Sequence, residues 1–310
     1  MQNEEQAALL IRNSITKHEG IVDILSMYRR NGFLDIVFPL ASTDLEGFMM
    51  SEEYDGIWDH MFDMSRLLLA IRHLASGLKF IHQGLEDPVR RSSILCHMDF
   101  RPNNILVYLK EESEGLDKIE FRICDFGIAK IQPKPYQVPP SLFPKPNSSR
   151  FTPVTHTKTG ARRFTGTHQA PEMYHNPGKV GRKSDVWSLA SIIIRLLTRQ
   201  LLGKKELDRF DERRADLNDE DEDFFFSDSS PTVLNEAVAG WLNDLSDPES
   251  ELCSLMVARL QVPSQRLARL RDVQTIPQRL STILRNALEV EAEKRSSSAQ
   301  LHEALMDLSY

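Results

Sequence analysis

Two short stretches constrain this chain more than any other feature of its sequence. Residues 94–106 read ILCHMDFRPNNIL and residues 121–130 read FRICDFGIAK. In each stretch, an apolar run that favours a β-strand leads into a loop with acidic or amide side chains. Such oxygens bind Mg²⁺ well, and phosphoryl transfer from a magnesium-bound nucleotide requires them together with an acid beside the attacking hydroxyl. The candidate residues are Asp99, Arg101, Asn104 and Asp125.

Composition places the chain among ordinary globular proteins. Of its 310 residues, 41% are hydrophobic and 27% are charged, and the length fits one two-lobed domain with insertions. The formal net charge of −7 argues against nucleic acid as the main partner. No apolar run approaches the roughly 20 residues of a membrane span, and the first residues lack the order of a signal peptide.

The cysteines point to a reducing compartment. They are Cys96, Cys124 and Cys253, with no close pair and no metal-ligand spacing. A disulfide framework is therefore not expected. The chain is predicted to be cytoplasmic or nuclear and not secreted.

Hydrophobic spacing predicts a few strands followed by many helices. We expect helices over residues 4–16, 64–82 and 184–198, and strands over 21–27 and 34–40 joined by a turn at Asn31-Gly32. From Val233 onward the spacing is helical, with breaks expected at Pro248, Pro263 and Pro277. Residues 132–163, rich in Pro, Ser, Thr and Lys, predict a long loop, and the acidic residues 206–223 predict a solvated, partly disordered insert.

The two stretches resemble the catalytic loop and the magnesium-binding loop of eukaryotic-type protein kinases. Downstream, GTHQAPE resembles the end of a kinase activation segment, and SDVWSLA resembles the start of the helix that supports the catalytic loop. The resemblance implies an α+β, kinase-like bilobal fold with an incomplete small β lobe and a large, mainly helical lobe. The implied division is a small-lobe remnant at 1–41 with a hinge at 39–41, and a large lobe at 42–310 with an activation segment at 125–172 and an acidic insert at 206–223.

The resemblance also implies roles for the loop residues, with ATP and Mg²⁺ as cofactors. Asp99 would orient the attacking hydroxyl, and Asn104 and Asp125 would bind magnesium. Arg101 stands where Ser/Thr kinases usually carry Lys, and it keeps positive charge near the transferred phosphoryl group. Together with the following Pro102, it favours Ser/Thr over Tyr in a protein substrate.

The same resemblance sketches a nucleotide pocket. Glu5, with Leu9 four residues later, resembles the middle of the regulatory helix. Leu9 would stack with His97 and Phe126 in the core. The other expected pocket residues are Phe38 at the back, Ala41 in the hinge Pro39-Leu40-Ala41, Leu106 beneath adenine, and Cys124 before Asp125. Phe38 and Leu106 would look the same as ordinary core residues.

Three residues of the large lobe are expected to support the loops. Asp185 would accept hydrogen bonds from the catalytic-loop backbone. Arg295 would pair with Glu172 of Ala-Pro-Glu, although an isolated Arg at such a position is more often a surface cation.

The pattern departs from the family near its start. No G-x-G-x-x-G motif occurs, and no V-A-I-K-like strand precedes the first helix. We therefore expect the chain to be either a fragment of a longer protein or a naturally shortened relative. Three functions remain open: a Ser/Thr protein kinase, a pseudokinase or scaffold with impaired catalysis, and a small-molecule phosphotransferase. The oligomeric state is not predicted.

Overall fold

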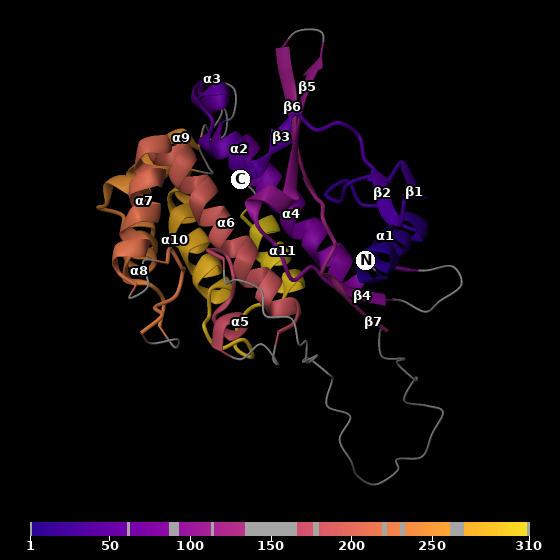
Figure 1. The fold of residues 1–310 in the computed structure, drawn as a ribbon. Helices are drawn as coiled ribbons and strands as arrows, with labels where there is room; N and C mark the ends of the chain where they lie inside the picture. Colours follow the sequence, from indigo (N-terminus) through magenta and orange to yellow (C-terminus); the bar gives the residue numbers. More distant parts are fainter. Residues whose placement is uncertain are drawn as a thin grey trace, which may run out of the picture.

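The computed structural model describes residues 2–60, 63–86, 93–112, 115–133, 166–175, 180–218, 222–229, 233–260 and 270–308. A strand-containing region lies beside a larger helical body, and the helices α4 and α6 run through that body (Figure 1). This arrangement confirms the α+β expectation of a small strand-rich part and a large helical part. Most of the predicted loop at 132–163 lies outside the described residues.

The first described helix and hairpin follow the sequence expectation closely. Helix α1 spans Gln2–Asn13, and strands β1 (Ser26–Arg30) and β2 (Phe33–Val37) pair antiparallel. Asn31 and Gly32 connect them with positive φ angles of 52° and 83°, as a type I′ turn requires. The first strand begins later than expected, because Ile21 instead forms a parallel bridge with Ile123.

Two small sheets position the polar loops. Strands β3 (Thr43–Asp44), β5 (Ile105–Glu112) and β6 (Gly115–Ile123) form one antiparallel sheet in the order β3-β5-β6. Strands β4 (Ser93–Cys96) and β7 (Lys130–Pro133) form another. The candidate catalytic loop therefore connects β4 to β5, and the Asp-Phe-Gly loop connects β6 to β7.

The helical body contains both long helices that the spacing predicted. Asp63 caps the first of them by accepting a hydrogen bond from the backbone N–H of Arg66 at 2.8 Å. No helix of the described segments is long and apolar enough to cross a membrane. The helices are α2 (Leu45–Met50), α3 (Asp55–His60), α4 (Met64–Gln83), α5 (Pro171–His175), α6 (Arg182–Leu202), α7 (Lys204–Asp216), α8 (Glu236–Ser246), α9 (Glu251–Arg259), α10 (Leu270–Ala287) and α11 (Ser298–Met306).

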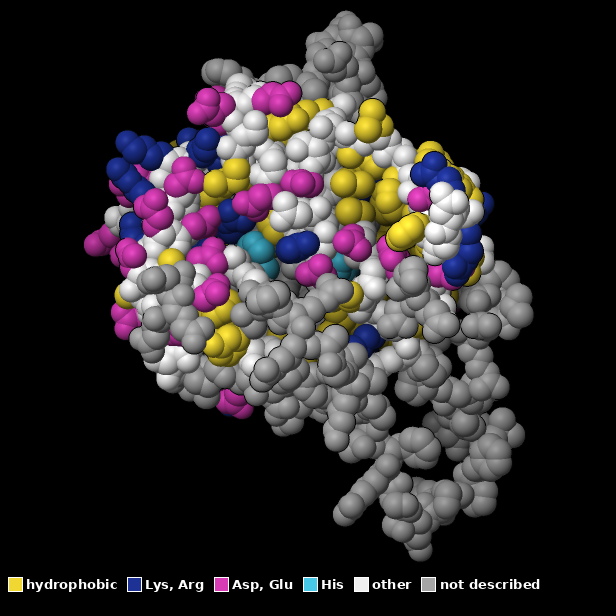
Figure 2. Space-filling view, viewed as in Figure 1, with side chains coloured by type: hydrophobic (Ala, Val, Ile, Leu, Met, Phe, Trp, Pro, Cys, Tyr) yellow, Lys and Arg dark blue, Asp and Glu magenta, His cyan; other side chains and the backbone are white. Residues whose placement is uncertain are grey.

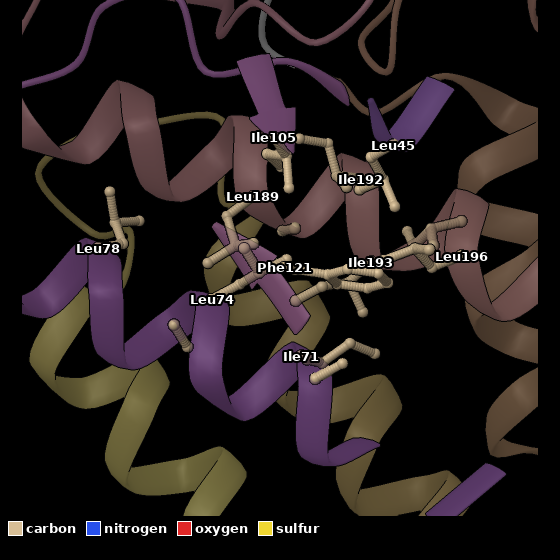
Figure 3. Close-up of a cluster of buried hydrophobic side chains, with 14 of the residues drawn as sticks. Leu45, Ile71, Leu74, Leu78, Ile105, Phe121, Leu189, Ile192, Ile193 and Leu196 are labelled. Atoms are coloured by element: carbon tan, nitrogen blue, oxygen red, sulfur yellow. The ribbon is translucent and has the colours of Figure 1, made fainter. Parts of the chain in front are cut away.

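The core forms where α4 and α6 meet the inner sides of β5 and β6. Figure 3 shows Ile71 and Leu74 of α4 facing Leu189 and Ile193 of α6, with Phe121 of β6 between them. The four aliphatic side chains are fully buried, and Phe121 is 2% exposed. Each contributes roughly 1.5–3 kcal/mol of hydrophobic free energy to folding, so this cluster anchors β5 and β6 to the helical body.

The acidic segment 206–223 differs from its expectation. Residues 204–216 form the regular helix α7, which buries Leu207, Phe210 and Arg214. These residues recur at spacings of three and four, so they share one face of the helix. The many acidic residues occupy the remaining faces, and they obscured a periodic pattern that the sequence does contain.

Pro277 also differs from its expectation, because it lies inside α10 instead of ending a helix. An internal proline costs a helix about 3 kcal/mol. Here Ile276, Leu280 and Leu284 are buried on the same helix, and their burial outweighs that cost. Pro263 lies outside the described residues.

Candidate active site

The two polar loops are joined by one buried histidine. Nε2 of His97 donates to the carbonyl of Cys124 at 2.9 Å, and Nδ1 accepts the N–H of Asp99 at 3.3 Å. The ring also packs on Phe126, with centroids 5.1 Å apart. The predicted contact of these two rings is confirmed. Leu9 does not join them, because 41% of its surface is exposed.

Asp185 fixes the backbone ahead of the catalytic loop, as the sequence predicts. Its carboxylate accepts the N–H groups of His97 and Met98, each at 2.8 Å, and Nε2 of His82 at 2.9 Å. Asp185 is 1% exposed, so these donors replace the water that the charge would otherwise need. They also hold Met98 at a φ of 70°, which a non-glycine residue adopts only when its surroundings enforce it.

Asp99 and Asn104 face each other across the loop. The Asn104 amide donates to the Asp99 carbonyl at 2.8 Å and to the Asp99 carboxylate at 3.2 Å. Nε of Arg101 lies 3.7 Å from the same carboxylate, but 53% of the Arg101 side chain is exposed. The arrangement leaves Asp99 oriented and 19% exposed, as a group that contacts a substrate must be.

Asn104 and Asp125 fit a magnesium ion by their chemistry. The Asn104 amide nitrogen is engaged with Asp99, which orients the amide oxygen away from that contact. Asp125 is exposed, has a φ of 57°, and uses Oδ1 to accept the Gly127 N–H at 3.1 Å. Within the described segments no group of three or more His, Cys, Asp or Glu could hold a metal. An amide and a carboxylate suit Mg²⁺, which takes its remaining ligands from phosphate and water.

The glutamate of α1 that faces the second loop is Glu4. A Cβ atom built on Gly127 would lie 3.8 Å from the Glu4 carboxylate carbon. The Glu5 named from the sequence instead forms an ion pair with Arg29 of β1. Glu4 shares its helix face with buried residues three, four and seven positions later, whereas Glu5 shares its face with the exposed Leu9. The buried residues are Ala7, Ala8 and Ile11.

The expected pocket residues lie around the hinge. Phe38, Ala41 and Leu106 are all half-buried, and Phe38 and Leu106 pack against the main core. The Tyr108 hydroxyl donates to the Pro39 carbonyl at 3.1 Å, whereas the Leu40 side chain is 97% exposed. Figure 2 shows hydrophobic side chains gathered between the β5–β6 hairpin and the β1–β2 pair.

Cys124 and Asp44 lie close enough to influence each other. Burial, followed by the charges of Asp125 and Asp44, raises the pKa of the Cys124 thiol to about 12. Asp44 also caps α2, because its carboxylate accepts the Gly47 N–H at 2.8 Å. Sequence reasoning missed Asp44. The available signal was an acid three residues after the hinge and directly ahead of an apolar helix.

The Ala-Pro-Glu segment is tied to the helical body. Nη1 and Nη2 of Arg295 donate to the two carboxylate oxygens of Glu172 at 2.8 and 3.0 Å. The Arg295 side chain is fully buried and stacks over Trp187 at 5.0 Å. The predicted pair is confirmed, and the alternative of a surface cation is excluded.

Asp99 lines a cavity of about 660 Å³. Its other walls include residues 166–169 of the activation segment and the acidic residues of α7, and acidic side chains surround this face in Figure 2. Arg195 joins two of the walls, because it donates to Glu46 at 2.7 and 3.0 Å and to Asp211 at 2.9 Å. The segment expected to be a solvated insert therefore forms part of the candidate site.

His168, one of the residues 166–169 that border this cavity, is deeply buried. Its Nδ1 lies 2.8 Å from the Ser191 hydroxyl, and its carbonyl accepts the Ser188 hydroxyl at 2.7 Å. Burial, together with the charges of Arg195 and Arg214, lowers the pKa of His168 well below 6.5. A neutral histidine therefore anchors this segment on α6.

Comparison with known proteins agrees with this geometry. The protein kinase domain family matches residues 4–305, so the chain belongs to the protein kinase family. It is 24% identical over 195 residues to cyclin-dependent kinase 7 of Dictyostelium discoideum, a match covering 62% of this chain and 42% of that protein. It is 29% identical over 217 residues to the proline-rich receptor-like protein kinase PERK5 of Arabidopsis thaliana, covering 69% and 25%. With mitogen-activated protein kinase 3 of Oryza sativa subsp. japonica it shares 26% over 192 residues, covering 59% and 39%. The matches span less than half the length of each of these relatives.

Proposed function

We propose that this protein kinase domain transfers the γ-phosphoryl group of ATP to Ser or Thr hydroxyls of proteins. The observation that carries the proposal is the joining of the two loops. Asn104 orients Asp99, and His97 connects that loop to the backbone just before Asp125. These are the groups that phosphoryl transfer needs, in the order and on the loops where protein kinases carry them.

In this mechanism Asp99 orients the attacking hydroxyl and takes up its proton. Asn104 and Asp125 would hold Mg²⁺, which when bound neutralises the charge of the nucleotide phosphates. Arg101 contributes positive charge beside Asp99, and its Lys-like position supports Ser/Thr over Tyr. Phe38, Ala41, Leu106 and Cys124 would border adenine.

The proposal also covers the division of the chain into two lobes and its location in the cell. Residues 1–41 would be the remnant of the small lobe and residues 42–310 the large lobe. The described thiols are free and buried, which supports a cytoplasmic or nuclear location.

The test uses the protein purified from its natural source. Its intact mass is measured first, since a mass above the 35.5 kDa of this chain would mean that the protein contains further residues. That protein is incubated with ATP, Mg²⁺ and a mixture of Ser, Thr and Tyr peptides. We expect phosphate on Ser and Thr, and Asp99→Asn to abolish it while thermal unfolding stays unchanged. The exposed Asp59→Asn is the matched control. Full activity in Asp99→Asn would overturn the assigned role.

A pseudokinase or scaffold is the second candidate, and Glu4 favours it. Glu4 faces the second loop and has no ion-pair partner within the described segments. This alternative predicts that ATP with Mg²⁺ fails to raise the unfolding temperature and that no peptide is phosphorylated. A small-molecule phosphotransferase is the least supported candidate, because Glu172, Asp185 and Arg295 form the contacts expected of protein kinases. It would consume ATP with a metabolite and not with a peptide.

A further inference from the structure

A second cavity lies on the other side of α7 from Asp99. It measures about 900 Å³ and is bordered by the end of α6 and by α7, α8 and α9, which lie together in Figure 1. Glu206, Phe210, Arg213 and Leu217 line it from α7, whereas Asp208, Asp211 and Glu212 of the same helix line the cavity at Asp99. The two cavities therefore use different faces of one helix, and the second contains none of the candidate catalytic residues.

The wall of this cavity offers apolar surface to a ligand. Leu202 and Leu217 are 36% and 43% exposed and both line it. Gly240 of α8 lies in the same wall, and a Cβ atom added there would meet no other atom within 4 Å. The space beside Gly240 is therefore open and bordered by leucines, which suits an apolar side chain.

One polar group in the wall has no partner. Trp241 is 6% exposed, and its indole N–H makes no hydrogen bond within the described segments. By contrast, the indole of Trp58 donates to the Phe48 carbonyl at 2.7 Å. Buried polar groups in folded proteins are almost always hydrogen-bonded, so Trp241 keeps an unused donor in a residue that lines the cavity, and the carbonyl of a ligand could accept from it.

The charge of the cavity indicates what kind of ligand it takes. Among the described residues, four carboxylates and one cation, Arg213, line it. Glu206 is paired with Arg209, and Glu236 and Glu251 occupy first helical turns, where carboxylates stabilise a helix. Asp244 has no such explanation, because it lies near the carboxyl end of α8, where the helix dipole disfavours a negative charge. The carboxylate of Asp244 therefore favours a cationic ligand.

We propose that this cavity is a docking site for a partner protein, which inserts an apolar side chain flanked by Lys or Arg. The apolar side chain would fill the space beside Gly240, a peptide carbonyl would accept from Trp241, and the cations would lie against Asp244 and its neighbouring carboxylates. The inference does not rest on the proposed catalytic function, because Gly240, Trp241 and Asp244 do not line the cavity at Asp99.

The test measures direct binding of three fluorescein-labelled helical peptides, each of 12 residues. One carries a leucine face flanked by lysines, the second a leucine face flanked by glutamates, and the third serines with the same lysines. We expect the leucine–lysine peptide to bind at least tenfold more tightly than either of the others, in an anisotropy titration with the whole protein. Equal binding of the glutamate peptide, or no binding of the lysine peptide, would overturn the proposal.

Two glycine variants locate the binding. Gly240→Leu fills the open space with a good helix former, so α8 keeps its structure while the peptide loses its place. Gly56→Leu is the matched control, since Gly56 is a helical glycine of α3 that also has open space around it and does not line the cavity. We expect Gly240→Leu to weaken binding at least tenfold and Gly56→Leu to change it by less than twofold. Equal affinities of the two variants would overturn the assignment.

The indole N–H signals give an independent readout. In a ¹⁵N-labelled protein, the Trp241 cross-peak should move on addition of the leucine–lysine peptide. Trp187 is the internal reference, because its N–H also lacks a partner within the described segments but lies buried in α6, away from the cavity. A Trp241 signal that stays fixed at saturating peptide would contradict the proposed contact.

Discussion

Asn104 holds Asp99 through two hydrogen bonds from a single amide nitrogen, one to the backbone carbonyl and one to the carboxylate. The backbone of Asn104 is held as well, because its main-chain carbonyl accepts the backbone N–H of Cys124 at 2.9 Å. The candidate base and the candidate metal ligand are therefore oriented by each other before any ligand arrives.

Removal of this amide should reduce phosphoryl transfer more than it reduces stability. We expect Asn104→Ala to lower kcat by at least about a hundredfold, a loss typical of removing a group that positions the reacting atoms. The measurement is steady-state phosphorylation by the protein from its source, with chemical unfolding as the control. A rise in KM alone, with kcat retained, would contradict the assigned position.

The ion pair between Glu172 and Arg295 should be a large contributor to stability. Arg295→Met leaves the Glu172 carboxylate, 10% exposed, without its bidentate partner. We expect the free energy of unfolding to fall by about 3–5 kcal/mol, as is usual when one member of a buried pair is removed. Urea unfolding measures this. The control is Arg209→Met, which removes the exposed pair with Glu206 and should cost less than about 1 kcal/mol.

Helix α7 should unfold with the rest of the large lobe. Phe210 is 5% exposed and lies edge-on to Phe225, with ring centroids 6.2 Å apart. Phe210→Ala is expected to lower the free energy of unfolding by about 3–5 kcal/mol. The exposed Asp216→Ala on the same helix should change it by less than about 0.5 kcal/mol. A negligible effect of Phe210→Ala would restore the view of this segment as a solvated insert.

Acid should destabilise the protein through His168. The folded protein keeps this side chain neutral because its pKa lies well below 6.5, whereas the unfolded chain binds a proton near pH 6.5. The unfolded state therefore gains protons first as the pH falls below 6.5, and stability decreases by up to about 1.4 kcal/mol per pH unit until the folded-state pKa is reached.

His168→Gln removes this titration and keeps hydrogen-bonding capacity towards Ser191. The measurement is urea unfolding at several values between pH 5 and pH 8 for both proteins. We expect the wild-type protein to lose stability more steeply than the variant below pH 6.5. Parallel curves would exclude His168 as the source.

The local motifs were readable from the sequence because they depend on short spacings. Asp99 and Asp125 each follow an apolar strand within a few residues, Asn104 directly precedes one, and the strands bring the three residues together. Glu172 and Arg295 were also predictable although they lie 123 positions apart, because the family resemblance supplied the pairing.

Other features depend on tertiary contacts that a linear pattern does not contain. Which glutamate of α1 faces the second loop depends on which side of the helix is buried. The small Ala7 and Ala8 face the core, whereas hydrophobicity alone favoured Leu9. The influence of Asp44 on the Cys124 thiol arises because the fold brings the residues after the hinge close to Cys124. Helix α7 was missed because its acidic residues outweighed a buried spacing of three and four.

The hydrogen bonds to Asp185 have a wider consequence. Its donors come from α4 and from the strand end at His97 and Met98, so the catalytic loop is held without any contribution from β1 or β2. In the proposed reaction, the side that receives the phosphoryl group is thus preorganised by the helical body. Under that proposal, variation in β1 and β2 alters the nucleotide side while leaving the acceptor side intact, so the two halves are free to diverge at different rates.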